Sequence, residues 1–181
     1  MLNLANKITL LRILLTPLVI LLLYFPGPAT SIIAVLLFIL ASITDWIDGY
    51  VARRENMVTS MGKFLDPLAD KVLICSVLIM FVQLEWAQAW VVIVIVCREL
   101  VVTGLRAIAI DEGIILAADK FGKAKTVLQI AAIVPLTLHY PIFGFEIWPI
   151  GTWLLYASMI VAIISGTNYC HYFYLHTRSG K

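Results

Sequence analysis

Six long apolar stretches, separated only by short polar or proline- and glycine-containing breaks, limit what this chain can fold into. They cover residues 8–25, 31–52, 66–84, 87–110, 126–140 and 149–173. Most have about the 20 residues that an α-helix needs to cross the hydrocarbon core of a bilayer. The chain is 62% hydrophobic and 13% charged, unlike a soluble domain, in which roughly a quarter of the residues are charged. We expect an all-α integral membrane protein with six transmembrane helices.

The six stretches use about two thirds of the 181 residues, so we expect one membrane domain over residues 1–181. Residues 2–9 alternate apolar and polar side chains, which predicts a short interfacial helix before the first span. Lys and Arg cluster at one set of helix ends, whereas the breaks after the first, third and fifth spans carry only Glu85 and Glu146. The positive-inside rule therefore places both termini and the loops 53–65 and 111–125 in the cytoplasm.

Several function classes are disfavoured by composition. The net charge is only +2 and no basic arm occurs, so we expect no nucleic-acid partner. The three cysteines are far apart and fit neither a disulfide framework nor a metal site. No Gly-rich Walker loop occurs, so ATP-driven function has no support.

Four acidic residues occur where a membrane helix should have none. Asp45 and Asp48 lie three apart near the end of the second span, and Asp66 and Asp70 lie four apart at the start of the third. Each pair shares one helix face, and the short connection brings the two faces together. Four such carboxylates cannot all stay ionised without cations, and their hard oxygens suit two Mg²⁺ or Mn²⁺ ions. Asp66 alone could instead cap its helix ahead of Pro67, but that explanation does not cover Asp45.

The residues around these acids suit a phosphate-bearing ligand. Gly49 and Ala52 lie on the same face as the first acidic pair and leave room for a ligand, while Arg53 and Lys63 stand at the rim. Gly62 precedes the second pair. One carboxylate facing an acceptor hydroxyl could act as a general base.

The eight positions Asp45-x2-Asp48-Gly49-x2-Ala52-Arg53-x8-Gly62-x3-Asp66-x3-Asp70 resemble the signature of the CDP-alcohol phosphotransferase family. The resemblance implies a di-metal site, a CDP-binding surface and a general base. The metal ligands would be Asp45, Asp48, Asp66 and Asp70, with Asp70 as catalytic base. The CDP moiety would be bound by Asp48, Gly49, Ala52, Arg53 and Gly62. An acceptor hydroxyl would attack the phosphorus next to the diacylglycerol and release CMP.

A second, basic cluster bears on the acceptor. Arg98 and Arg106 lie eight residues apart on nearly the same helix face, and Lys123 and Lys125 open the fifth span. These cations could receive an acceptor phosphate. The lysines could equally be positive-inside anchors beside anionic lipid. Arg98 could be a structural partner of Glu99, although adjacent helix positions point about 100° apart and make Glu99 a poor partner.

The segments NKITLLR, CRELVVTGLR and FGKAKTVLQ resemble the bacterial phosphatidylglycerophosphate synthase branch of the family. That branch implies CDP-diacylglycerol as donor and sn-glycerol 3-phosphate as acceptor, at the cytoplasmic face of the bacterial inner membrane. Inositol phosphate, phosphatidylglycerol or serine are alternative acceptors. A divalent-cation transporter and a structural subunit are more remote alternatives. The family resemblance and the small residues Ser158, Ala162 and Gly166 at spacing four also suggest a homodimer.

Overall fold

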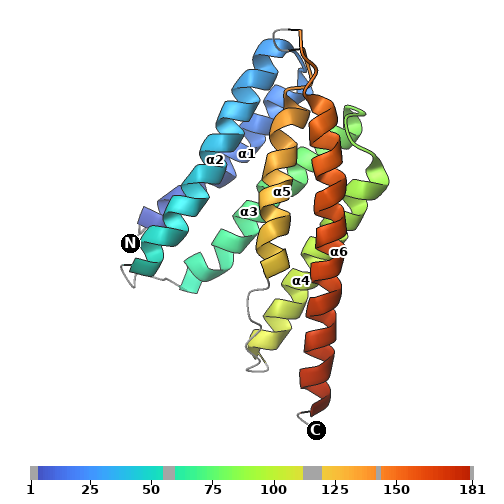
Figure 1. The fold of residues 1–181 in the computed structure, drawn as a ribbon. Coiled ribbons are helices and arrows are strands. Elements are labelled where there is room, and N and C mark those ends of the chain that lie inside the picture. Colours follow the sequence, from blue (N-terminus) through green and yellow to red (C-terminus); the bar gives the residue numbers. More distant parts are fainter. Residues whose placement is uncertain (1–3, 55–59, 112–119, 142–143, 180–181) are drawn as a thin grey trace.

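The computed structural model describes the backbone of residues 4–54, 60–111, 120–141 and 144–179, and the side chains of residues 10–44, 71–109, 121–141 and 144–175. The described part consists of six α-helices and contains no β-strand (Figure 1). The helices are α1 (Leu4–Tyr24), α2 (Pro28–Arg54), α3 (Ser60–Gln83), α4 (Ala89–Asp111), α5 (Lys120–Thr137) and α6 (Trp148–Ser179).

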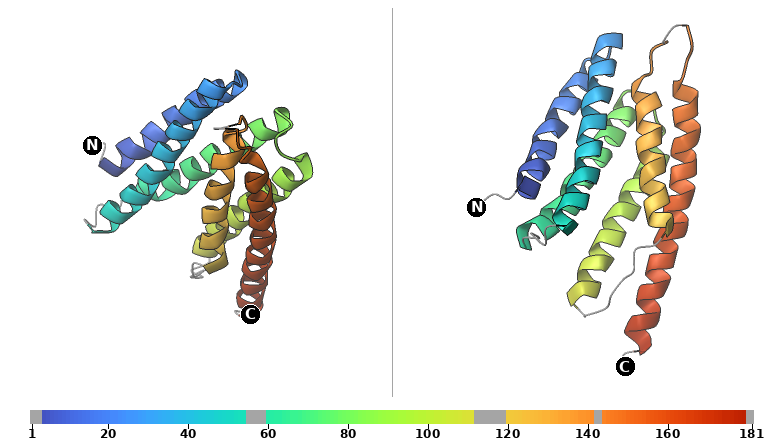
Figure 2. Two further views of the ribbon diagram at one scale, coloured as in Figure 1. Left: turned by 45° about the horizontal axis from the view of Figure 1, so that its top comes forward. Right: turned by 60° about the vertical axis from the view of Figure 1, so that its left-hand side comes forward.

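The helices alternate in direction along the bundle. The connections from α1 to α2, α3 to α4 and α5 to α6 lie at one end (Figure 1). At the opposite end lie the start of α1, the end of α2, the start of α3, the end of α4, the start of α5 and the end of α6. Two further views place α1 and α2 on one side of the bundle and α5 and α6 on the other (Figure 2). The ends at which Lys and Arg cluster in the sequence are therefore gathered together.

The observed helices match the six expected stretches in number and order, and they differ mainly in length. α2 continues to Arg54, α3 begins at Ser60 and α6 continues to Ser179. These extensions lie at the basic end, where polar residues replace apolar ones. They contain no proline, and the one glycine among them, Gly62 of α3, does not stop the helix. The separate N-terminal helix expected over residues 2–9 is not found in its described part, because residues 4–9 belong to α1. α1 runs without a break from Leu4, because no helix breaker separates its polar start from its apolar part.

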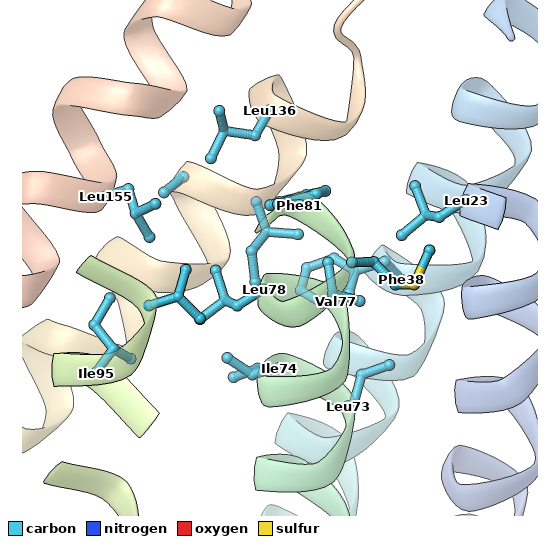
Figure 3. Close-up of a cluster of buried hydrophobic side chains, with 14 of the residues drawn as sticks. Leu23, Phe38, Leu73, Ile74, Val77, Leu78, Phe81, Ile95, Leu136 and Leu155 are labelled. Carbon is cyan, nitrogen blue, oxygen red and sulfur yellow. The ribbon is translucent and has the colours of Figure 1, made fainter. Parts of the chain in front are cut away.

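The hydrophobic core surrounds α3. Leu73, Val77, Leu78 and Phe81 are buried on this helix and belong to one cluster with Phe38 of α2 (Figure 3). The same cluster includes Leu23 of α1, Ile95 of α4, Leu136 of α5 and Leu155 of α6. All six helices thus share one core, with α3 positioned against both halves of the chain.

α6 uses its small residues inside the chain. Ser158, Ala162 and Gly166 are buried. A Cβ atom added to Gly166 would lie 3.1 Å from Cγ of Arg98 on α4. One added to Gly151 would lie 2.8 Å from Cγ of Leu136 on α5. The small-residue face therefore serves packing within the chain and does not by itself indicate a dimer interface.

Within the described residues, one helical segment, Trp148–Leu175 of α6, is long and apolar enough to cross a membrane. Shorter apolar segments occur at Leu10–Tyr24, Pro28–Thr44 and Lys71–Gln83. Large apolar side chains are exposed on the outer faces, for example Leu14, Leu36, Ile93, Val127 and Trp153. Such extensive apolar surface on the outside of the bundle is unusual for a monomer in water and fits lipid surroundings.

Candidate active site

The four acidic residues lie on the two helices that end and begin together at the basic end of the bundle. Asp45 and Asp48 belong to the last turns of α2, and Asp66 and Asp70 to the first turns of α3. Arg54 and Ser60 bound the short connection, so the two helix ends can be no more than about 20 Å apart. The side chains of the four acids lie outside the described residues.

Helix periodicity relates these positions to the described core. Phe38 and Ala41 are buried on α2, and positions 45 and 48 continue their line at spacings of four and three. On α3, Leu73 and Val77 are buried, and positions 70 and 66 continue their line in the other direction. Phe38 of α2 and Val77 of α3 belong to the same buried cluster (Figure 3). The positions of the acids therefore continue the buried lines of α2 and α3, both of which contribute to the shared core.

The donor set fits divalent metal ions by its chemistry. Four carboxylates on two helices joined by a short connection supply only hard oxygen ligands, the kind that Mg²⁺ and Mn²⁺ prefer. Among the residues whose side chains are described, no group of three or more His, Cys, Asp or Glu side chains could hold a metal ion. That part of the chain thus offers no alternative metal site to the four signature acids.

The residues expected to bind CDP flank the same acids. Gly49, Ala52 and Arg53 lie on α2 and Gly62 lies on α3. Their backbone is helical, and their side-chain surroundings lie outside the described residues. Their role in binding CDP stays a prediction.

Arg12 is a residue whose position the sequence did not predict. Its charge fits the positive-inside pattern, yet its side chain is only 1% exposed. It shares a buried face of α1 with Thr16, Val19 and Leu23, and α1 packs against both α2 and α3. A useful signal was present in the sequence, because Arg12 is in register with this otherwise uncharged face.

Arg98 is held by three groups. Its Nε donates to the carbonyl oxygen of Ala162 at 3.2 Å, and its Nη2 donates to Oγ of Ser165 at 2.6 Å. Its Nη1 lies 3.2 Å from Oε1 of Glu99. Glu99 was not expected to be an ideal partner, yet the structural pair of Arg98 with Glu99, which the sequence left open as an alternative, is present. The long guanidinium side chain bends along the helix surface and makes up for the angle between the two positions.

Glu99 also binds a second cation. Its Oε1 accepts a hydrogen bond from Nζ of Lys125 on α5. Lys71, the residue after Asp70, donates to Oγ1 of Thr103, which in turn donates to the carbonyl oxygen of Glu99 at 2.5 Å. The described side chains of this cluster carry three cations and one carboxylate, which leaves a net charge of +2.

A small cavity of about 10 Å³ lies inside this cluster and is lined by Lys71, Glu99, Lys125 and Gln129. It has room for roughly one water molecule. Gln129 is 1% exposed, and its Nε2 has no hydrogen-bond partner. Such an unpaired buried donor is uncommon and often marks a place for a water or a ligand. Spacing alone gave no role to Lys71, Glu99 or Gln129.

Arg98 and Arg106 share a face, as their spacing predicts. The guanidinium carbons lie 6.0 Å and 4.9 Å from the ring centre of Tyr169 on α6. Arg106 also donates from Nη2 to the hydroxyl oxygen of Tyr169. Lys123 is exposed on α5, whereas Lys125 is buried. The structure thus brings Arg98, Arg106 and Lys125 into one cluster of α4, α5 and α6 and leaves Lys123 on the surface.

Comparison with known proteins identifies the family of this chain. The sequence model of the CDP-alcohol phosphatidyltransferase family matches residues 2–164. The chain belongs to this family.

Among its relatives, a protein of Bacillus subtilis (strain 168) named CDP-diacylglycerol–glycerol-3-phosphate 3-phosphatidyltransferase is 43% identical, over 93% of this chain and 94% of the relative. A protein of Rickettsia bellii with the same name is 37% identical, over 92% and 93%. A probable phosphatidylglycerophosphate synthase of Mycobacterium tuberculosis (strain H37Rv) is 39% identical, over 92% of this chain and 79% of the relative.

Proposed function

We propose that this protein transfers the phosphatidyl group of CDP-diacylglycerol to sn-glycerol 3-phosphate, giving phosphatidylglycerophosphate and CMP. The observation that carries the proposal is the eight-position signature on α2 and α3, whose acids continue the buried lines of these two helices. The relatives named for this reaction cover nearly the whole chain and support the same substrates.

In the proposed reaction the primary hydroxyl of the acceptor attacks the phosphorus that carries the diacylglycerol. A new P–O bond forms, the P–O bond to CMP breaks, and CMP leaves. The carboxylate of Asp70 accepts the hydroxyl proton, a contribution of about 10²- to 10⁴-fold in rate for a general base. Asp48, Gly49, Ala52, Arg53 and Gly62 would bind and orient the CDP moiety.

Asp45, Asp48, Asp66 and Asp70 would hold two Mg²⁺ ions, with Mn²⁺ as an alternative. When bound, the metals neutralise negative charge on the diphosphate. The four carboxylates are also relieved of their mutual repulsion by the same charges. We therefore expect that chelation of divalent ions abolishes activity and that added Mg²⁺ restores it.

A phosphorylated acceptor is favoured by the charge of the second cluster. Arg98, Lys125 and Lys71 against Glu99 leave a net +2, and a phosphate monoester carries about −1.5 to −2 at neutral pH. Arg106, partly exposed beside Tyr169, and Lys123 would add to the attraction. A zwitterionic acceptor such as serine would leave this charge unbalanced. Inositol phosphate would balance it, and phosphatidylglycerol, with one negative charge, would do so in part.

In the membrane, we propose six spans with both termini and the active site on the cytoplasmic side of a bacterial inner membrane. The support is the common location of the basic helix ends. A homodimer rests on the family resemblance alone, because the small-residue face of α6 packs within the chain.

The test measures CMP release by the purified protein in detergent, with CDP-diacylglycerol and Mg²⁺. The acceptors are glycerol 3-phosphate, inositol phosphate, serine, phosphatidylglycerol and none. We expect release with glycerol 3-phosphate only. Release with a different acceptor would overturn the assignment of the acceptor but keep the transfer chemistry. No release with any acceptor, from folded protein, would favour the cation-transport alternative.

A further inference from the structure

We propose that Glu99 is a positioning residue of the acceptor-phosphate site, which holds Arg98 and Lys125 in the geometry that receives the phosphate. This inference rests on the proposed function and deepens it. Glu99 is 4% exposed. Its Oε1 forms ion pairs with both Arg98 of α4 and Lys125 of α5. The presence of a carboxylate in a site that binds an anion requires an explanation, because its negative charge repels the ligand.

The contacts supply that reason. Arg98 and Lys125 repel each other and would move apart without a shared anion. Glu99 joins them, and its carbonyl oxygen accepts from Thr103, which is bonded to Lys71. The single residue therefore connects α4 to cations of α3 and α5. Arg98 is fixed on its other side by Ala162 and Ser165 of α6.

The cluster retains capacity for an anion despite these bonds. A guanidinium has five N–H donors and an ammonium has three, and the contacts to Glu99, Ala162 and Ser165 use only part of them. Gln129 lines the same small cavity as Lys71, Glu99 and Lys125, and its buried Nε2 has no hydrogen-bond partner, so it is a further available donor. With Glu99 included, Lys71, Arg98 and Lys125 still leave a net charge of +2, which matches the charge of a phosphate monoester.

Substitution of Glu99 by Gln separates two opposite expectations. If the carboxylate acted only through its charge, its removal would make the site more positive and lower the KM for glycerol 3-phosphate. If it positions Arg98 and Lys125, its removal lets both move and raises that KM. We expect a rise of at least about tenfold, with kcat changed by less than about threefold and the KM for CDP-diacylglycerol unchanged.

Two further variants make the result specific. Glu99→Asp keeps a carboxylate that can still reach one cation, so we expect a smaller rise in the acceptor KM. Lys125→Met removes one of the two cations, and in that background Glu99→Gln should raise the KM less than it does alone, because part of its role is already lost. Equal effects in both backgrounds would contradict a role exercised through Lys125.

The outcomes also separate this inference from the proposed function. The wild-type protein is assayed first, and failure to use any phosphorylated acceptor overturns both. If it uses one, an unchanged or lowered acceptor KM in Glu99→Gln overturns the positioning role and leaves the function intact. If Glu99→Gln does not fold, as judged by thermal unfolding in detergent, Glu99→Asp decides by the same criterion.

Discussion

At the scale of single residues, Gly166 determines where Arg98 can lie. A Cβ atom at this position would meet Cγ of Arg98 at 3.1 Å and its Nε at 3.7 Å. Such contacts are tight, and Arg98 has little freedom to move because Ala162, Ser165 and Glu99 hold its guanidinium. Glycine here serves the placement of a charged group on a neighbouring helix.

We predict that Gly166→Ala raises the KM for the acceptor several-fold, because the added methyl group displaces Arg98. The KM for CDP-diacylglycerol should stay the same. Steady-state kinetics with each substrate varied in turn measures both values. Gly104→Ala is the matched control, since a Cβ atom there meets nothing within 4 Å. An unaltered acceptor KM in Gly166→Ala would show that Arg98 does not bind the acceptor in this position.

Tyr169 gives a second residue-scale prediction. Tyr169→Phe removes the hydroxyl that accepts from Arg106 but keeps the ring that lies 4.9 Å from its guanidinium. Loss of one such hydrogen bond is worth about 1 kcal/mol, so we expect a rise in acceptor KM of about threefold to tenfold. Tyr169→Leu also removes the cation–π contact and should raise it further. Equal kinetics for Tyr169→Phe and wild type would show that the hydroxyl does not orient Arg106.

The sequence predicted part of this site and missed part of it for physical reasons. Spacing along a helix was enough to place Arg98 and Arg106 on one face. It could not predict that Glu99 joins Arg98 to Lys125, because that contact depends on side-chain bending and on the approach of α5. The burial of Arg12 and Gln129 likewise depends on how three or more helices pack, and not on local pattern.

At the scale of helices, the close approach of α5 and α6 depends on Gly151. Its position lies so near α5 that a Cβ atom would come within 2.9 Å of the carbonyl oxygen and the amide nitrogen of Ala132 and Leu136, respectively. Backbone atoms cannot yield as a flexible side chain can. The two helices must therefore separate if any side chain is placed there.

We predict that Gly151→Ala destabilises the protein by about 1–3 kcal/mol, the usual cost of overpacking. The measurement is thermal unfolding of the purified protein in detergent. Gly104→Ala again serves as control, because in open helical surroundings the change to Ala is neutral or stabilising by up to about 1 kcal/mol. A Gly151→Ala protein as stable as wild type would contradict the close helix packing.

Helix number and order were predictable from the long apolar stretches and the breaks between them, whereas helix ends were not. The apolar stretches end where polar residues begin, yet α2 continues to Arg54 and α6 to Ser179. Backbone hydrogen bonding does not require apolar side chains, and no breaker stops these helices. The continuous α1 has the same explanation, since only a breaker would separate its start from the rest.

At the scale of the whole molecule, the arrangement predicts a sidedness that can be measured in cells. Glu146 lies at the end with the α5–α6 connection, and Arg178 belongs to the far end of α6. In a protein with Cys75, Cys97 and Cys170 replaced by Ser, we expect Glu146→Cys to react with an impermeant maleimide on the outside of intact cells. Arg178→Cys should react only after permeabilisation. The reverse pattern would contradict a cytoplasmic active site.

The central claim is that the acids on α2 and α3 form a phosphatidyl-transfer site with Asp70 as its base. The most direct test is CMP release from CDP-diacylglycerol and glycerol 3-phosphate by Asp70→Asn, compared with Glu146→Gln at the opposite end of the bundle. We predict that Asp70→Asn loses at least about 10²-fold in rate while remaining folded, and that Glu146→Gln retains wild-type activity. A fully active Asp70→Asn protein would contradict the claim.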